Sequence, residues 1–441
     1  MLEGAVTRRS FSLSWAMALA GVACAVGSPA RAEDGHRAVV PLVERPRATR
    51  LGCSLIEPVC VHSAGTERVA PTVAAEALTA AERTLAFLRR SGLPRPLEDG
   101  ALGSGPEFDV YLAPRATASR AYDDAASVLG PYDRTSAFAV VAAAHRGCEL
   151  ASDVARTIGQ AALLGLDPGA HESTLGLGSS KLAAVVAPCP LLEAEALDRF
   201  QRNPERALVH ATMNAFAGEA LWVDYLDETY GQGVPTRLWS ELVAIGGKRN
   251  ETESFYWKSE PDVFDVLRRL FLGLGTNLDE VTLGFAIARA FVGSRSDGGH
   301  LIDTEHFGDF GRVRFDWSVP LTSLPRRLRT RAIEATGASY IWLDTAGATE
   351  AHSITVSAEC EHAHAFRWAL VTVDTEGREL GRHTGGRWGE DTTQLSLASL
   401  KDVAGVVVVG TTAGHDDREH AFDPEDGFIS SAVCEVTLRR D

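Results

Sequence analysis

The chain has 441 residues, 45% of them hydrophobic, with 59 acidic and 43 basic side chains and a formal net charge of −16 at pH 7. An acidic surface repels nucleic-acid phosphates and anionic lipid headgroups, so the composition argues against both as partners. The length allows two hydrophobic cores, because domains usually hold about 100–200 residues.

Residues 1–32 are predicted to be a cleaved export signal. Arg8 and Arg9 lie in Thr-Arg-Arg-Ser-Phe, a twin-arginine pattern, and an apolar stretch follows at 13–27. Ala30-Arg31-Ala32 then forms a small-x-small cleavage site. The apolar stretch is shorter than the ~20 residues that a membrane-spanning helix needs. We therefore expect a mature protein without a transmembrane segment that begins at Glu33.

Two alternatives to the twin-arginine signal stay open. One is a Sec signal with two arginines in its positive region, although Arg31 places a charge where Sec signals seldom carry one. The other is a lipid anchor at Cys24, but Gly21 stands where such signals usually have leucine. Either export route predicts a periplasmic or secreted protein.

The fold class predicted for the mature chain is α+β. Residues 33–66 are expected to be an N-terminal extended segment, and residues 67–292 a helix-rich domain. Strands are predicted there at 108–112, where apolar residues alternate, and at the apolar run 137–143. The glycine-rich stretch 176–180 is interpreted as a turn, and Asn277 with Glu280 as a capping box. Apolar residues at three- and four-residue steps predict helices at 78–88, 150–161, 209–226, 235–245, 263–274 and 281–291.

A flexible linker is predicted at 293–299, which contains three glycines and two serines. Beyond it the period of the apolar residues changes from 3.6 to 2, as at 353–359 and 366–370. Short alternating strands separated by turn residues are typical of a β-sandwich. We therefore expect an all-β sandwich domain at 300–441.

Six cysteines remain after cleavage, which is typical of disulfides in an oxidising compartment. Six cysteines allow 15 pairings, but their positions favour one set. Two are close neighbours near the N-terminus, two are alone in the C-terminal part, and two are left. A zinc site is the alternative, although no C-x-x-C spacing occurs. The predicted bonds are Cys53–Cys60, Cys148–Cys189 and Cys360–Cys434.

The sequence contains no complete zinc-peptidase motif. In H-E-x-x-H, two histidines four residues apart share one helix face and hold zinc, while the glutamate activates a water. His171-Glu172 begins this pattern, but Leu175 ends it. The inverted H-x-x-E-H pattern fails at 300–306, where four residues separate His300 from Glu305. The histidine pair at 362 and 364 and the acidic stretch 416–427 are interpreted as surface loops.

The stretch from Ser136 to Gly233 resembles a family of secreted zinc metalloproteases of the HExxH type found in myxobacteria. In that family an alternating strand leads into an active-site helix, and a later helix ends in Y-L-x-x-x-Y-G. The counterparts here are 136–143, 149–165 and 225–231, with Leu238-Trp239 following. The paired cysteines at 53 and 60 and the downstream β-domain are similar too. The resemblance implies a metallopeptidase-like fold for the helix-rich domain.

At the place of H-E-x-x-H this chain has Asp153-Val154-Ala155-Arg156-Thr157. Asp153 can ligate a metal, but Thr157 is a poor ligand and Val154 cannot act as a base. Glu172 and Glu219 are candidates for a third ligand, with solvated or capping acids as the alternative. The resemblance thus implies a degenerate active-site helix with no catalytic residue, no bound metal and no other cofactor.

We therefore expect an exported pseudoenzyme that binds a peptide or protein through its former substrate cleft. One alternative is an active metal-dependent hydrolase with a non-standard site, which would hold zinc. The other is a structural or adhesive envelope protein. A filled, apolar gap between the Asp153 helix and the predicted helix 209–226 would favour that last function.

Overall fold

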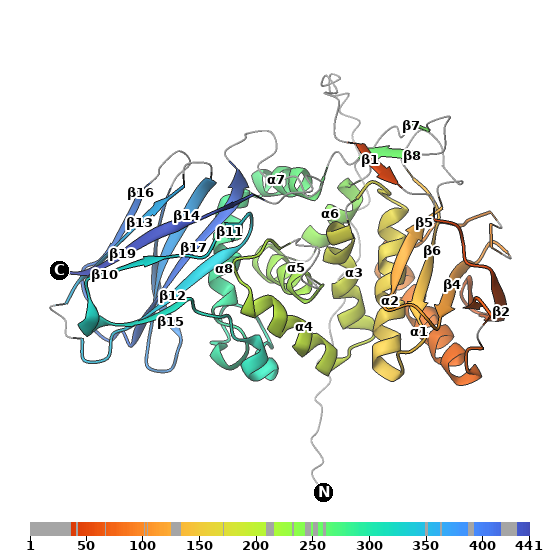
Figure 1. Cartoon of the computed structure of the whole chain (residues 1–441), viewed down its shortest axis with the longest axis horizontal. Helices are drawn as coiled ribbons and strands as arrows, with labels where there is room; N and C mark the ends of the chain where they lie inside the picture. Colours follow the sequence, from red (N-terminus) through yellow and green to blue (C-terminus); the bar gives the residue numbers. More distant parts are fainter. Residues whose placement is uncertain are drawn as a thin grey trace, which may run out of the picture.

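A computed structural model describes residues 37–40, 43–66, 68–100, 102–103, 105–124, 134–170, 172–208, 216–231, 233–242, 248–249, 255–258, 262–348, 352–361, 364–386, 392–415 and 430–441. The predicted export signal, His171, His362 and the acidic stretch 416–427 lie outside these residues. The described parts form a row, with an N-terminal sheet and its helices at one end, a group of helices in the middle and β-sheets at the other end (Figure 1). The α+β class is confirmed, with helices before the C-terminal β-sheets.

The N-terminal sheet has five strands in the order β2-β3-β4-β6-β5. The three inner strands are parallel to one another, and both edge strands are antiparallel to their neighbours. The strands predicted at 108–112 and 137–143 are confirmed as β4 and β6. Part of the segment expected at 33–66 lies inside this sheet, because β3 is buried over almost its whole length. The strands are β2 (Ala48–Cys53), β3 (Val59–Ala64), β4 (Phe108–Ala113), β5 (Arg120–Asp123) and β6 (Ala137–Ala142).

Two long helices, α1 (Pro71–Ser91) and α2 (Gly147–Leu164), pack against this sheet and against each other. Helix α1 begins at a proline, whose missing N–H is no loss in the first turn, and ends at Gly92 in the left-handed conformation. Its apolar residues recur at three- and four-residue steps, so one stripe of the helix meets the sheet. Helix α2 presents Leu150, Val154 and Ile158 to the same core.

The middle of the molecule is a group of helices, with a small sheet of order β1-β8-β7 beside the N-terminal part (Figure 1). The side chain of Asn277 accepts the backbone N–H of Glu280 at 2.9 Å, which confirms the N-cap half of the predicted capping box of α8, and the Glu280 carboxylate accepts from the hydroxyl of Thr276 at 3.0 Å. The elements are α3 (Glu172–Val186), α4 (Pro190–Arg202), α5 (Phe216–Tyr230), α6 (Val234–Glu241), α7 (Val263–Gly273), α8 (Leu278–Arg289), β1 (Arg37–Val40), β7 (Lys248–Arg249) and β8 (Phe255–Lys258).

The turn predicted at 176–180 is wrong, because these residues lie inside α3. Gly178 serves the close packing of helices rather than chain reversal. A Cβ on Gly178 would lie 1.8 Å from Cζ2 of Trp239, on α6. On α2, a Cβ on Gly159 would lie 3.0 Å from the Cα of Ser179, so α2 and α3 approach backbone to backbone. A glycine-rich stretch therefore forms a helix here because tertiary contacts outweigh its low intrinsic propensity.

The C-terminal part contains two packed sheets of orders β15-β14-β17-β12-β9 and β10-β19-β13-β16. Their facing sides share one core that includes Ile341, Leu370 and Val408 from the first sheet and Val356 and Leu438 from the second. This arrangement is the expected β-sandwich. The strands are β9 (Trp317–Pro320), β10 (Arg326–Arg329), β12 (Ala338–Asp344), β13 (Ile354–Cys360), β14 (His364–Val373), β15 (Glu379–Gly385), β16 (Thr392–Leu397), β17 (Gly405–His415) and β19 (Cys434–Arg440), with a short pair β11 (Ile333–Glu334) and β18 (Ser431–Ala432).

The other face of the five-stranded sheet is covered by α8. Tyr340, Val407 and Val409 lie in one cluster with Leu283 and Ile287 of that helix. The hydroxyl of Tyr340 donates to the backbone oxygen of Ala286 at 2.7 Å. An apolar contact therefore joins the helical part to the β-sandwich.

The flexible linker predicted at 293–299 is also wrong. Its first residues form the 3₁₀ helix η2 (Gly293–Arg295), which crosses a second one, η3 (Glu305–Gly311). Gly293 has φ 68°, and a Cβ there would lie 2.1 Å from the backbone oxygen of Gly308. The glycine is needed for a close backbone crossing, not for flexibility.

The three predicted disulfides are confirmed. Cys53–Cys60 joins β2 to β3, Cys148–Cys189 joins the beginnings of α2 and α4, and Cys360–Cys434 joins the neighbouring strands β13 and β19. Within the described ranges, no single helix is both long and apolar enough to cross a membrane. Helices α7 and α8 reach that length and composition only together, and they are bent by 96° at the break between them.

Candidate functional site

The predicted degenerate helix is α2, and Asp153 lies two turns from its N-terminus, where it is 7% exposed. Its Oδ2 accepts hydrogen bonds from the Ser119 hydroxyl at 2.6 Å and from Nδ1 of His145 at 2.7 Å. Its Oδ1 accepts from the guanidinium of Arg156 at 3.0 Å. Three side chains of this protein thus occupy both oxygens of the candidate ligand on this helix.

The charge state of Asp153 follows from these contacts. Burial alone would raise the pKa of its carboxyl, but the charge of Arg156 and the hydrogen bonds from Ser119, Arg156 and His145 lower the pKa below its usual value. Ser119 is itself held in place, because its hydroxyl oxygen accepts the backbone N–H of Ala142 at 2.9 Å. The carboxylate is therefore ionised and satisfied within the fold.

The other two positions of the degenerate motif face the interior. Val154 is 0% exposed and packs between α2 and the N-terminal sheet. Thr157 is also 0% exposed, and its hydroxyl donates to the backbone oxygen of Val154 at 3.0 Å. Position 154 thus lies in an apolar core.

The two candidate third ligands lie on other helices. Glu172 is the first residue of α3, and Glu219 lies in the first turn of α5. Their side chains lie outside the described part of the structure. Helix α3 packs against both α2 and α5, and it lies between them in Figure 1. The gap between the Asp153 helix and α5, expected as the former cleft, is therefore occupied by a helix.

His145 was not singled out from the sequence. Its Nδ1 is held by Asp153, its Nε2 lies 3.5 Å from Oε1 of Glu149, and its side chain is 29% exposed. The turn between β6 and α2 brings the two partners together across eight residues. An Asp-held imidazole with its other nitrogen near the surface is the arrangement of a general base.

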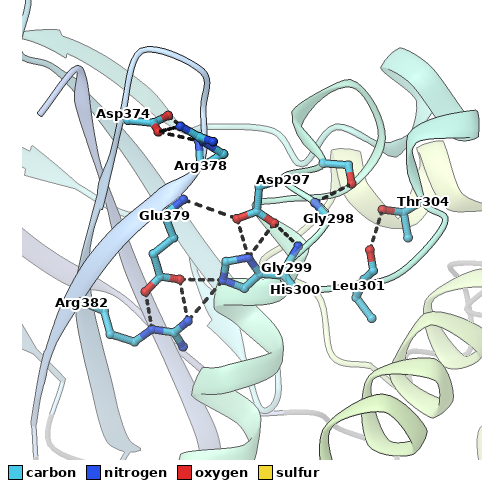
Figure 2. A network of polar contacts seen from close by, with 11 residues as sticks. Asp297, Gly298, Gly299, His300, Leu301, Thr304, Asp374, Arg378, Glu379 and Arg382 are labelled. Atoms are coloured by element: carbon cyan, nitrogen blue, oxygen red, sulfur yellow. Dashed lines mark hydrogen bonds and ion pairs between the residues drawn. The ribbon is translucent and has the colours of Figure 1, made fainter.

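A second polar network joins the segment after α8 to the β-sandwich (Figure 2). His300 lies between two carboxylates, with Nδ1 at 3.0 Å from Asp297 and Nε2 at 2.7 Å from Glu379. Arg382 donates to Glu379 through Nε at 2.6 Å. On the side of α8, the imidazole stacks on Phe291 with centroids 4.1 Å apart and planes 2° apart.

These contacts favour a doubly protonated imidazole. Burial alone would lower the pKa of His300, but the hydrogen bonds and charges of Glu379 and Asp297 raise it above its usual value. In return, His300 and Arg382 lower the pKa of Glu379 to about 2, against the opposing effect of burial. The failed inverted motif thus supplies a structural ion network. His306, its other histidine, bonds to the backbone oxygen of Asp303 instead.

No group of three or more His, Cys, Asp or Glu side chains within the described ranges is arranged to hold a metal ion. The network of His300 is held together by hydrogen bonds and ion pairs, because both ring nitrogens lie at hydrogen-bond distance from carboxylate oxygens.

Beside this network lies a groove between the helical part and the five-stranded sheet, which we call the junction groove. It consists of two adjoining pockets of about 530 and 560 Å³ that share Arg295, Arg312 and Phe315. Phe291, which stacks on His300, lines the first pocket together with Trp342. The sequence carried no sign of this groove, because its lining comes from segments far apart in the chain.

Comparisons with known proteins add little. No protein-family model matches the chain, and no curated protein matches it. Among solved structures, the pre-peptidase C-terminal domain of a collagenase from Bacillus anthracis covers 29% of this chain and 97% of its own, with 8% sequence identity and a TM-score of 0.20. A likeness this weak supports no inference about function.

Proposed function

We propose that the protein is an exported, non-catalytic binding protein with a metallopeptidase-like ancestry, and that its ligand is a peptide or a protein. The observation that carries this proposal is the environment of the degenerate helix. Asp153 is bonded on both oxygens by Ser119, His145 and Arg156. A zinc peptidase needs free ligands and an accessible base, and Val154 stands in the core at the position of that base.

We place the binding site in the junction groove rather than in the former cleft. Helix α3 packs against both helices that would form the cleft walls. Each pocket of the junction groove has a volume within the 300–1,000 Å³ typical of ligand sites. Aromatic and guanidinium groups, which are enriched where proteins bind peptides, line it.

The experiment that tests the proposal uses the mature chain from Glu33 onward. Zinc content is measured by elemental analysis, and cleavage of casein and of a mixed fluorogenic peptide library is followed with and without a chelator. Binding of the same library, labelled but not fluorogenic, is measured by fluorescence anisotropy. We expect no stoichiometric zinc, no chelator-sensitive cleavage and saturable peptide binding. One zinc per chain together with chelator-sensitive cleavage would refute the non-catalytic function.

Export is part of the proposal and has a test of its own. Replacing Arg8 and Arg9 by lysine should block export if the twin-arginine route is used, whereas unchanged export would point to the Sec route. Mass spectrometry of the exported protein should give Glu33 as its first residue. A lipid on Cys24 would contradict both the cleavage site and the unanchored form.

A hydrolase is the second candidate, and the pairing of His145 with Asp153 favours it. An imidazole oriented through Nδ1 can take a proton from water at Nε2. A hydrolytic activity that disappears in His145→Ala but persists in His306→Ala, whose ring is exposed elsewhere, would support this candidate. The filled gap around α3 favours the third candidate, a structural or adhesive protein. That function predicts no saturable binding of small peptides.

A further inference from the structure

Arg295 is a partly buried cation that forms no ion pair with any carboxylate of the described residues. It ends η2 and lines both pockets of the junction groove. One guanidinium nitrogen donates to the backbone oxygen of Val313 at 2.8 Å. In the described part of the chain no carboxylate lies within ion-pairing distance of it. The other arginines that line the groove are paired, Arg312 with Asp309, Arg202 with Asp198 and Arg314 with Glu205.

The guanidinium lies over an aromatic ring. It lies 3.9 Å above the ring centroid of Phe315, and that ring is parallel to Trp342, with centroids 5.9 Å and planes 6° apart. Trp342 lies against the backbone of β17, because a Cβ on Gly405 would be 2.1 Å from its ring. An arginine that lies over an aromatic face can still donate hydrogen bonds from its edge, and here one nitrogen donates to Val313 while the others are left for a ligand.

The electrostatics of this position favour an anion. Burial first, and then the nearby charge of Arg312, lower the pKa of Arg295 to about 10, although Asp309 opposes this. A partly desolvated cation beside a second cation gains more from an anionic ligand than an exposed arginine would. Glu376, also at the groove, is ion-paired with Arg378 at 2.5 Å, an arginine that Asp374 also contacts at 2.9 Å.

We propose that the junction groove binds the free C-terminal carboxylate of a peptide whose last side chain is aromatic or apolar. A planar carboxylate matches two parallel N–H groups of one guanidinium, and its single charge matches Arg295, the one groove arginine that no described carboxylate pairs. The terminal side chain packs on the floor formed by Phe315 and Trp342. This inference rests on the proposed peptide-binding function and names the chemistry of its ligand.

The test uses the full mature chain and four probes. Two are N-terminally fluorescein-labelled tetrapeptides, Gly-Gly-Ala-Phe as the free acid and as the C-terminal amide. Two are unlabelled competitors, N-acetylphenylalanine and its amide. We expect the free-acid peptide to bind at least about tenfold more tightly than its amide, because a charge-assisted hydrogen bond is lost in the amide. Equal affinities for acid and amide would overturn the inference.

Variants locate the carboxylate. Arg295→Gln should lower the affinity for the free-acid peptide about tenfold and leave the affinity for the amide unchanged. Arg295→Lys should give an intermediate loss of affinity for the free acid, because lysine keeps the charge but not the planar pair of N–H donors. Arg237→Gln, at an exposed arginine of α6, is the matched control and should change neither the affinity for the free acid nor that for the amide. Thermal unfolding of each variant checks that the fold persists. If Arg295→Gln were unfolded, Trp342→Leu, which weakens acid and amide alike, would test the floor instead.

The outcomes separate the two proposals. Peptide binding that ignores both Arg295 and the carboxylate would overturn this inference and leave the proposed function standing. If N-acetylphenylalanine bound as tightly as the free-acid tetrapeptide, the ligand would not be a peptide. That result would overturn the proposed function, while the carboxylate site remained. Absence of binding by all four probes would overturn the inference.

Discussion

The indole of Trp239 occupies the space into which a side chain on Gly178 would project, so that a Cβ there would lie 1.8 Å from Cζ2 of the indole. The two residues join α3 to α6 in the middle of the molecule. Trp239 is 6% exposed, and its ring also packs in the core of the N-terminal sheet and its helices. Because residue 178 is a glycine without a Cβ, the indole of Trp239 can lie against α3 while it also packs in the core of the N-terminal sheet and its helices.

Gly178→Ala should therefore destabilise the protein although alanine is the better helix former. Overpacking of a buried site costs about 1–3 kcal/mol, and an overlap this deep places the expected loss at the upper end of that range. The free energy of unfolding, measured by urea denaturation, checks the value. Gly273→Ala is the matched control, because nothing lies within 4 Å of a Cβ there. It should be neutral or stabilise by up to about 1 kcal/mol.

The network of His300 should make stability depend on pH. The pKa of His300 is raised in the folded state, so its contribution is complete below its unfolded pKa, about 6.5, and is lost as the pH rises through the folded value. The pKa values of Asp297 and Glu379 are lowered, so their contributions are present above about 4–4.5 and are lost in acid. All three groups contribute together between about pH 5 and 6.5.

The measurement is the thermal midpoint of wild type and His300→Gln from pH 4 to 9. The melting temperature of the wild type should exceed that of the variant most near pH 5–6, by at least about 1 °C, the shift that 1 kcal/mol gives in a protein of about 400 residues. The difference should shrink toward pH 9. His306→Gln serves as the control and should follow the wild-type curve. A difference that is constant across the whole range would show that His300 contributes by packing on Phe291 alone.

Removing a disulfide should lower the free energy of unfolding, and the loss should be larger for the bond that closes the longer loop. Cys360–Cys434 closes a loop with a sequence separation of 74 and Cys53–Cys60 one of 7. Chain entropy predicts a loss of about 4 kcal/mol for the paired serine variant of the first and about 2 kcal/mol for that of the second. Chemical denaturation of the two double variants measures both. The reverse order would mean that packing around the sulfurs, rather than loop closure, dominates.

Introducing an H-E-x-x-H motif at positions 153–157 should unfold α2 instead of creating a metal site. The variant carries Asp153→His, Val154→Glu and Thr157→His. Val154 and Thr157 are both 0% exposed, and an unpaired carboxylate at 154 would enter an apolar core at a cost of several kcal/mol, on the order of 3 or more. Circular dichroism and zinc content are the readouts. A folded variant with one zinc per chain would show that these positions face a cleft.

Local patterns were enough to predict the strands β4 and β6, the β-sandwich and most of the helices, because burial of one face imposes a period of 2 or 3.6 on the sequence. The three disulfides were also predictable, since the partners of each pair lie in one structural region. The resemblance to a metallopeptidase family rested on local patterns too. It singled out Asp153, Val154 and Thr157, but it did not show which residues surround them.

Only the tertiary structure decided which polar groups meet. Asp153 is bonded by Ser119, which lies 34 residues earlier in the sequence, and His300 by Glu379, 79 residues later. The stack of Arg295, Phe315 and Trp342 likewise joins η2 to the segment before β9 and to β12. Sequence spacing records the period of one element, whereas such contacts depend on how elements pack. For the same reason, the glycines at 178 and 293 suggested a turn and a linker, although each permits a close contact that exists only in the folded chain.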